Sequence, residues 1–168
     1  MSFIFDSIDR FVAGTVGEPG ERAFFIQALH GTRLVTLALE KAQVSALAER
    51  LAIVINDLRR NDFSLKVRDL PRDDAPLDTP IEAEFEVGAI SLAWDESQSR
   101  MSIELFEISA PEGQAGNSLK VALDISQCGA FVKRSKALVS AGRLPCPFCG
   151  LPIDPHAHLC PRANGYRR

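Results

Sequence analysis

The second half of this sequence repeats the pattern of the first half, and no other feature constrains the fold as strongly. Residues 34–54 align with residues 118–138 at a constant offset of 84. This alignment pairs Gln43 with Gln127 and Arg50 with Arg134. Upstream, residues 11–16 (FVAGTV) resemble residues 85–90 (FEVGAI), which places Gly14 opposite Gly88. A repeat implies that one copy cannot bury its own apolar face, so we expect the two copies to pair around a pseudo-twofold axis.

Hydrophobic spacing predicts three strands followed by one helix in each copy. Apolar residues between positions 41 and 60 recur every three or four residues, which is typical of one helix face. The alternation of apolar and polar residues slips by one position at Gly88, which predicts a β-bulge there. The predicted strands are 11–16, 23–29, 34–39, 81–94, 101–108 and 119–125, and the predicted helices are 41–60 and 126–141.

These elements predict an α+β fold in which two βββα repeats form an antiparallel sheet covered by two helices. The repeats cover about 8–60 and 81–142 and make up one domain, residues 1–142. Residues 69–80 (DLPRDDAPLDTP) join the repeats and hold three prolines and four aspartates, so we expect a linker too polar to pack. Residues 143–168 are rich in proline and cysteine and are predicted to form a separate C-terminal zinc-binding segment.

Charge and composition narrow the class of protein. The net charge of −3 combines an acidic middle, residues 69–112 with 2 basic and 12 acidic side chains, and a basic end, residues 113–168 with 8 basic and 2 acidic. Such a dipolar chain is not typical of a nucleic-acid-binding protein as a whole. No apolar run approaches the roughly 20 residues of a membrane helix, and residues 1–10 carry charges where a signal peptide is apolar. We therefore expect a cytoplasmic protein whose cysteines are reduced thiols or metal ligands.

The cysteine spacing of the C-terminal segment predicts a metal site. Cys146-Pro-Phe-Cys149-Gly150 is a C-x-x-C-G turn, in which two thiolates can hold one ion. A second short turn carries a histidine two residues before Cys160. Three cysteines and one histidine close a tetrahedral shell, which favours a structural zinc over a catalytic one. The predicted zinc ligands are Cys146, Cys149, His158 and Cys160.

His158 is preferred to His156 as the fourth ligand, with Asp154 a more distant alternative. The His158-x-Cys160 pair forms a ligand turn opposite the first one, and a proline follows both Cys146 and Cys160. A redox role for the C-x-x-C pair is disfavoured, because such a pair normally opens a helix and the prolines that follow prevent one.

The remaining candidate side chains are expected to be structural. Cys128 lies on the apolar stripe of the second helix and is predicted to be a core residue. His30, next to Gly31, is expected to be a solvated loop histidine, and Glu82, Glu84 and Glu86 the polar face of a strand. We expect Lys133, Arg134 and Lys136 to form a solvated face of the second helix. The sequence holds no nucleophile elbow, phosphate-binding loop, dinucleotide-binding loop or H-E-x-x-H motif.

The C-terminal sequence CPFCGLPIDPHAHLCPRANGYR resembles the signature of an uncharacterised actinobacterial family, the domain of unknown function 3090. The opening FDSIDRFVAGTVGEPGERAFFIQA and the helix LEKAQVSALAERL are also similar to that family. The resemblance implies a cytosolic protein without an established activity, and it places the family's histidine on His158. It also implies two partner classes by gene association: a histidine-phosphatase-like protein and a phosphatidylinositol-kinase-like protein.

These observations favour a zinc-stabilised cytosolic binding or adaptor protein that is not an enzyme. One alternative is a hydrolase or transferase that uses the zinc or a cleft in the sheet, which an open ligand position would favour. A second alternative is anion or nucleic-acid binding, which a steep salt dependence would favour. The basic side chains available for it in the C-terminal segment are Arg143, Arg162, Arg167 and Arg168.

Overall fold

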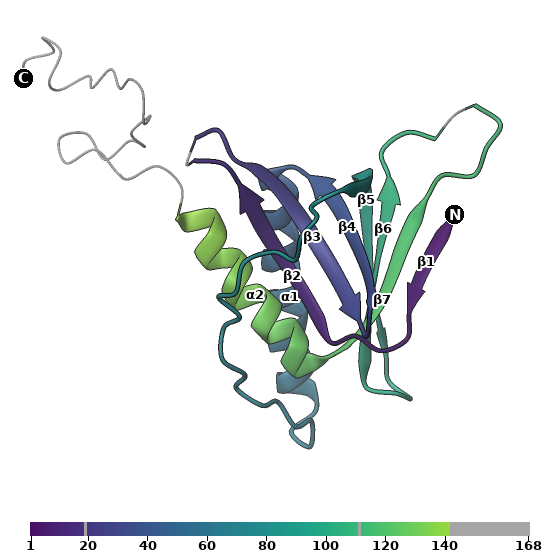
Figure 1. Ribbon diagram of the computed structural model, residues 1–168. Coiled ribbons are helices and arrows are strands. Elements are labelled where there is room, and N and C mark those ends of the chain that lie inside the picture. The colour runs from purple at the N-terminus through teal and green to yellow at the C-terminus, as the bar shows by residue number, and fades with distance from the viewer. Residues whose placement is uncertain (19, 111, 142–168) are drawn as a thin grey trace, which may run out of the picture.

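The structure is a computed structural model that describes residues 1–18, 20–110 and 112–141. In it a seven-stranded sheet packs against two helices (Figure 1). The elements are β1 (Ser2–Phe5), β2 (Arg10–Val16), β3 (Ala23–His30), β4 (Arg33–Leu39), α1 (Lys41–Asn61), β5 (Ala83–Asp95), β6 (Arg100–Glu107), β7 (Ser118–Asp124) and α2 (Ile125–Ser140).

The α+β class predicted from the sequence is confirmed. The last three strands before α1 are β2, β3 and β4, and the three strands between α1 and α2 are β5, β6 and β7. The pairing of β5 with β6 shifts between Val87 and Ile90, so the bulge predicted at Gly88 is confirmed. β1 was not predicted, because four residues are too few to show a clear alternation.

The strand order β1-β7-β6-β5-β4-β3-β2 combines antiparallel and parallel pairs. The strands within each half are antiparallel, as expected. The two halves, however, join through parallel pairs that the sequence did not predict: β4 pairs with β5, and β7 pairs with β1. β4, the third strand of the first half, is thus paired with β5, which begins the second half, and β7 is paired with β1, which precedes the first half.

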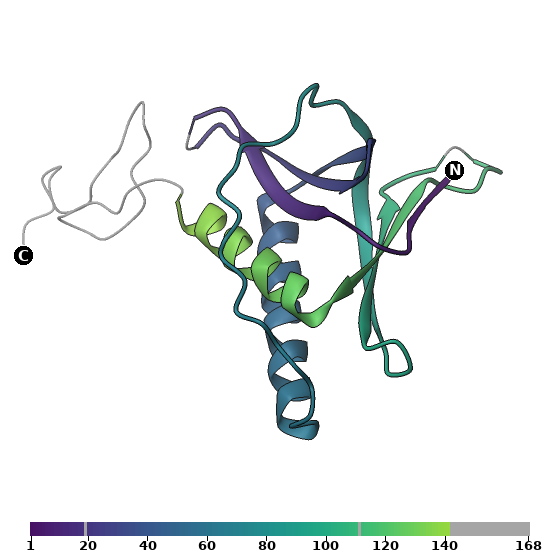
Figure 2. The same cartoon turned by 60° about the horizontal axis from the view of Figure 1, so that its bottom comes forward.

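The strand order, together with one short connection, forces the sheet to curl. β1 and β2 lie at opposite edges, yet only residues 6–9 connect them. Seven strands in a flat sheet span roughly 29 Å from edge to edge, whereas the connection reaches at most about 18 Å. Figure 2 shows the result: β2–β4 and β5–β7 meet at an angle, and both helices lie within that angle.

Both helices begin with the same arrangement of side chains. The backbone N–H of Glu40 donates to Oε1 of Gln43 at 2.7 Å, and that of Asp124 donates to Oε1 of Gln127 at 3.0 Å. Each glutamine also donates through Nε2 to a backbone carbonyl of the other half, Gln43 to Val87 and Gln127 to Ile8. The first turn of each helix is therefore tied to the opposite half of the sheet.

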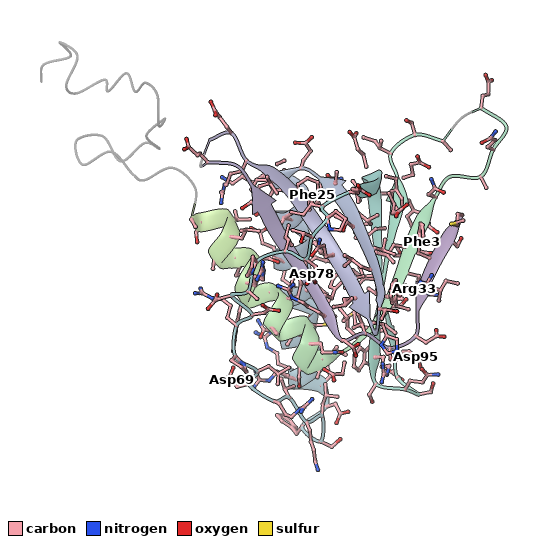
Figure 3. All side chains as sticks on the ribbon, in the orientation of Figure 1. Phe3, Phe25, Arg33, Asp69, Asp78 and Asp95 are labelled. Carbon is pink, nitrogen blue, oxygen red and sulfur yellow. The ribbon has the colours of Figure 1, made fainter. Side chains whose placement is uncertain are left out.

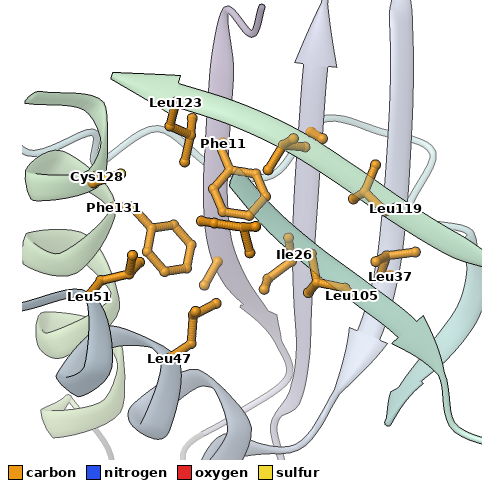
Figure 4. Packing of buried hydrophobic residues seen from close by; sticks show 14 of the residues in the cluster. Phe11, Ile26, Leu37, Leu47, Leu51, Leu105, Leu119, Leu123, Cys128 and Phe131 are labelled. Carbon is orange, nitrogen blue, oxygen red and sulfur yellow. The ribbon is translucent and has the colours of Figure 1, made fainter. Parts of the chain in front are cut away.

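The core lies between the helices and the inner face of the sheet (Figure 4). The rings of Phe11 and Phe131 stack with their centroids 4.9 Å apart, and Leu47 and Leu51 of α1 pack beside them. Cys128 is fully buried in this core, as predicted, and burial raises the pKa of its thiol to about 12. Neither helix of the described residues is long and apolar enough to cross a membrane.

Residues 69–80, called the strap below, have no helix or strand, but they pack against the domain, contrary to the expectation of a solvated linker. The strap crosses α2 and continues to β5 (Figure 1). The side chain of Leu77 is buried and lies over Gly14 of β2. A Cβ atom at Gly14 would stand 2.4 Å from Cδ2 of Leu77, so the strap needs a residue without a side chain beneath it.

Gly14→Val is expected to lower the free energy of unfolding by about 1–3 kcal/mol, because overpacking pushes Leu77 and the strap away from β2. Urea unfolding followed by circular dichroism measures the change. Gly129→Ala is the matched control, since a Cβ atom there meets nothing within 4 Å and alanine favours the helix by about 1 kcal/mol. Equal stability of Gly14→Val and wild type would contradict the packing of the strap.

Candidate binding groove

Two nearly buried arginines attach the strap to the domain. Arg10 of β2 and Arg134 of α2 have side chains 15% and 11% exposed. Nε of Arg10 donates to the Asp73 carboxylate at 2.7 Å, and its Nη1 donates to Asp78 at 3.1 Å. Nη1 of Arg134 lies 3.4 Å from the same Asp73 carboxylate. Two aspartates of the strap thus neutralise two cations that come from different layers of the fold.

The same arginines also satisfy carbonyl groups of the irregular strap backbone. Nη1 of Arg134 donates to the carbonyls of Asp73 at 2.7 Å and Ala75 at 2.6 Å, and its Nε donates to Ala13 on β2 at 2.7 Å. Nη2 of Arg10 donates to Ala75 at 2.9 Å and to Pro76 at 3.0 Å. Arginine suits this task because its planar fork offers five donors with fixed directions.

A buried amide holds the other end of the strap. Gln27 of β3 is 1% exposed, and its Nε2 donates to the Asp78 carbonyl at 2.8 Å while its Oε1 accepts from the Asp78 N–H at 2.8 Å. Nε2 also lies 3.2 Å from the Thr36 hydroxyl. A polar side chain buried in a sheet must find partners, and here the strap supplies them. Figure 3 labels Asp69 and Asp78 near the two ends of the strap.

The charged groups of this cluster shift one another's pKa values. The hydrogen bond from Arg10 lowers the pKa of Asp73 below its ordinary value, and the charges of Arg10 and Arg134 act in the same direction. Burial alone would lower the pKa of Arg10, but the bonds and charges of Asp73 and Asp78 raise it above its usual value. Burial lowers the pKa of Arg134, which still remains a cation at neutral pH.

Arg10→Met is expected to raise the pKa of Asp73 toward its ordinary 3.8, because the largest cause of the depression is removed. A carboxylate with a depressed pKa stabilises the fold above its unfolded pKa, and this contribution is lost as the pH falls through the folded pKa. The loss therefore occurs below pH 3.8 in the wild type. Carboxyl carbon chemical shifts, measured by NMR against pH, report the value. Arg72→Met is the control, since Arg72 bonds Asp74 and should leave Asp73 unchanged.

A groove of about 740 Å³ lies between the strap, β2 and the last turns of α2, and is called the α2 groove below. Its apolar lining comes from both sides, Leu77 and Ile81 on one and Ala137 and Leu138 on the other. Arg134 and Thr15 add polar groups to it. Ala141 also lines the groove and is the last residue described before the C-terminal segment. The last described residue therefore lies at the rim of the groove.

The four predicted zinc ligands, Cys146, Cys149, His158 and Cys160, lie outside the described residues, as do the alternatives His156 and Asp154. Among the residues that are described, no group of three or more histidine, cysteine, aspartate or glutamate side chains could hold a metal ion. His30 is exposed, and its Nδ1 lies 3.4 Å from the carboxylate of Asp9. The glutamates 82, 84 and 86 are exposed, as predicted.

The prediction of a solvated basic face on α2 is wrong for Arg134. Its side chain is nearly buried because the aspartate-rich strap, expected to stay in solvent, folds onto it. Lys133 likewise bonds the Asp69 carboxylate and donates to the Leu70 carbonyl at 3.1 Å. Sequence reasoning also missed Arg10. The one available signal was charge complementarity, since four aspartates of the linker needed basic partners elsewhere in the chain.

Comparison with known proteins identifies the chain only at the level of its family. Neither the curated proteins nor the solved structures contain a match. A family described as protein of unknown function (DUF3090) matches residues 3–160. That range holds both halves of the sheet, the strap and all four predicted zinc ligands. The chain therefore belongs to the DUF3090 family of proteins of unknown function.

Proposed function

We propose that this chain is a zinc-stabilised binding protein of the cytoplasm, and that it engages another protein at the α2 groove. The observation that carries the proposal is the position of the groove: it is open, lined from two sides by apolar side chains, and ends at Ala141 where the C-terminal segment begins. A groove of this size fits an extended segment of a partner. Arg134, Thr15 and the backbone of the strap supply polar groups that can orient such a segment.

The chemistry of the donor set supports zinc in the C-terminal segment. Three thiolates and one imidazole, from Cys146, Cys149, His158 and Cys160, match the ligands of structural zinc sites. A closed shell of this kind leaves no position for a water molecule, so its role is to fold the segment. In the cytoplasm the thiols stay reduced and available to the metal. The zinc would then hold the C-terminal segment in one folded arrangement.

We also propose that the two halves are copies of one βββα unit. The same order of elements, the matching first turns at Gln43 and Gln127 and the two parallel pairs between the halves support this. Superposition of residues 8–60 on residues 81–142 tests the proposal. It predicts that α1 and α2 coincide when the strands are aligned, and helices that point in different directions would contradict it.

Isothermal titration calorimetry tests the groove with a partner of the class implied by family gene association, a purified histidine-phosphatase-like protein. We expect saturable binding to the wild-type chain and a loss of at least tenfold in affinity for Leu138→Glu, which places a charge in the apolar lining. Ile53→Glu is the control, because Ile53 is 52% exposed on α1 and does not line the groove. Equal binding by both variants would place the contact elsewhere on the chain.

Zinc content is tested separately by elemental analysis of protein purified without added metal. We expect one zinc per chain, held without exchange through dialysis. A ratio near zero, together with three thiols that titrate in the native protein, would exclude the zinc-stabilised form of the proposal, because the fourth cysteine, Cys128, is buried in the core.

A further inference from the structure

We propose that residues 151–154 of the C-terminal segment, Leu-Pro-Ile-Asp, bind in a second groove between α1 and β5, where Asp154 pairs with Arg50. This inference rests on the proposed duplication of the two halves. It assigns to the C-terminal segment the position that the strap occupies in the other half.

The groove between α1 and β5, called the α1 groove below, has a volume of about 320 Å³. It is mostly apolar, and Arg50 is the one charged side chain that lines it. Arg50 is exposed and makes no hydrogen bond or ion pair with any described residue. The lining residues are Gln43, Ala46, Leu47 and Arg50 of α1 and Gly88, Ile90 and Leu92 of β5.

The corresponding pocket on the other half is partly lined by the strap. Gln127, Ala130 and Phe131 of α2 line it, at the positions that Gln43, Ala46 and Leu47 hold in α1. Leu70 and Asp73 of the strap line the same pocket. The strap thus supplies one apolar and one acidic side chain to the pocket beside α2, whereas no residue of an equivalent segment lines the α1 groove among the described residues.

The arginines beside the two pockets occupy equivalent positions. Counted from the N-caps Glu40 and Asp124, Arg50 and Arg134 are each ten residues along their helix. Arg134 donates to the Asp73 carbonyl at 2.7 Å and lies 3.4 Å from the Asp73 carboxylate. Among the described residues, Arg50 therefore has no acidic partner equivalent to Asp73.

The C-terminal segment carries that partner in the same local sequence. The strap reads Leu70-Pro71-Arg72-Asp73, and the C-terminal segment reads Leu151-Pro152-Ile153-Asp154. Leu-Pro-x-Asp occurs at these two places only, and Asp154 is the sole acidic residue between positions 142 and 168. The second copy replaces the exposed Arg72 by isoleucine, which suits a groove with an apolar lining.

The connection to residues 151–154 is longer than the connection that leads into the strap. Nine residues lead from Asn61, the end of α1, to Leu70 in the pocket beside α2. Eleven residues lead from Ser140, the end of α2, to Leu151. An extended connection of eleven residues spans up to about 36 Å, which is more than the nine residues from Asn61 to Leu70 can span. The segment would then pass between the two predicted ligand turns, with Cys149 before it and His158 after it.

Site-specific cross-linking in the full-length chain tests the occupant directly. The photo-reactive residue p-benzoylphenylalanine replaces Ala46 at the rim of the α1 groove or, as a control, Ile53 on the exposed side of the same helix. Illumination is expected to join position 46, but not position 53, to the peptide that contains residues 151–154 of the same chain. A covalent dimer, a cross-link to other peptides or no cross-link at position 46 would overturn the proposal.

Hydrogen exchange tests the pairing of Asp154 with Arg50. In the full-length protein Arg50→Ala and Asp154→Asn are each expected to speed amide exchange at Ile153 about tenfold, and the double variant no further, because both changes remove one charged contact. Arg59→Ala, at an exposed position in the last turn of α1, is the control that leaves the rate unchanged. Unchanged exchange in Arg50→Ala, or loss of zinc from Asp154→Asn, would overturn the pairing. The cross-link and the exchange rates are measured independently of the duplication. If the two halves fail to superpose, the duplication is refuted, but these two measurements still decide whether residues 151–154 lie in the α1 groove.

Discussion

Arg134→Ala is expected to lower the free energy of unfolding by about 3 kcal/mol, among the largest losses for any single change outside the apolar core. The guanidinium is 11% exposed and donates to three backbone carbonyls, those of Ala13, Asp73 and Ala75. Its removal leaves these acceptors and the Asp73 carboxylate short of partners in a partly buried place, and such groups are costly. Urea unfolding measures the loss.

The variant should also free the strap before the domain unfolds. Limited proteolysis is therefore expected to cut between residues 69 and 80 at lower protease concentration than in the wild type. Arg134→Lys separates charge from geometry, because a lysine keeps the cation but cannot direct donors to Ala13 and to the strap together. Arg134→Lys should restore less than half of the free energy of unfolding that Arg134→Ala loses. Lys133→Ala, whose side chain is 45% exposed, is the control and should cost under 1 kcal/mol. A resistant strap in Arg134→Ala would refute its anchoring role.

The elements with regular spacing were predictable from the sequence, and their partners in the sheet were not. α1 was predicted as residues 41–60 and spans Lys41–Asn61, because its apolar stripe extends over about four turns. The bulge near Gly88 followed from one slip in the alternation. The parallel pairs of β4 with β5 and of β1 with β7 join residues far apart in sequence, and nothing in local periodicity encodes such pairs. The shortness of residues 6–9 made the curled sheet necessary, but only once β1 was known.

The strap shows why the α2 groove escaped prediction. Proline and aspartate made residues 69–80 read as solvated, and the segment does lack regular structure. Its order comes from contacts over long sequence distances, to Arg10, Gln27 and Arg134, and each of these side chains lies in an otherwise ordinary strand or helix. Composition reports the polarity of such a segment but not whether its polar groups find partners.

Cys149→Ser is expected to abolish zinc binding. Among the substitutions named, this is the largest expected effect, because zinc binds to structural sites with a free energy on the order of 10 kcal/mol. The C-terminal segment has few apolar side chains with which to fold alone. The domain 1–141, in contrast, holds a buried core of its own around Phe11 and Phe131. The variant should therefore become sensitive to protease after residue 141, while the far-ultraviolet circular dichroism changes little. Chelator treatment of the wild type should reproduce this pattern.

Substitutions of His156 and His158 test which histidine is the fourth zinc ligand. This question is separate from whether zinc folds the segment. His158→Ala should behave as Cys149→Ser does, because each removes one of four ligands and opens the shell. His156→Ala should keep one zinc per chain and a protease-resistant segment. If instead His156→Ala releases the metal and His158→Ala retains it, the assignment of the fourth ligand is wrong although the zinc remains. If Cys149→Ser loses the zinc but its segment stays as resistant as the wild type, the metal does not hold the segment together. The three variants, assayed for zinc and for cleavage in the same preparation, therefore test the ligand set and the folding role independently.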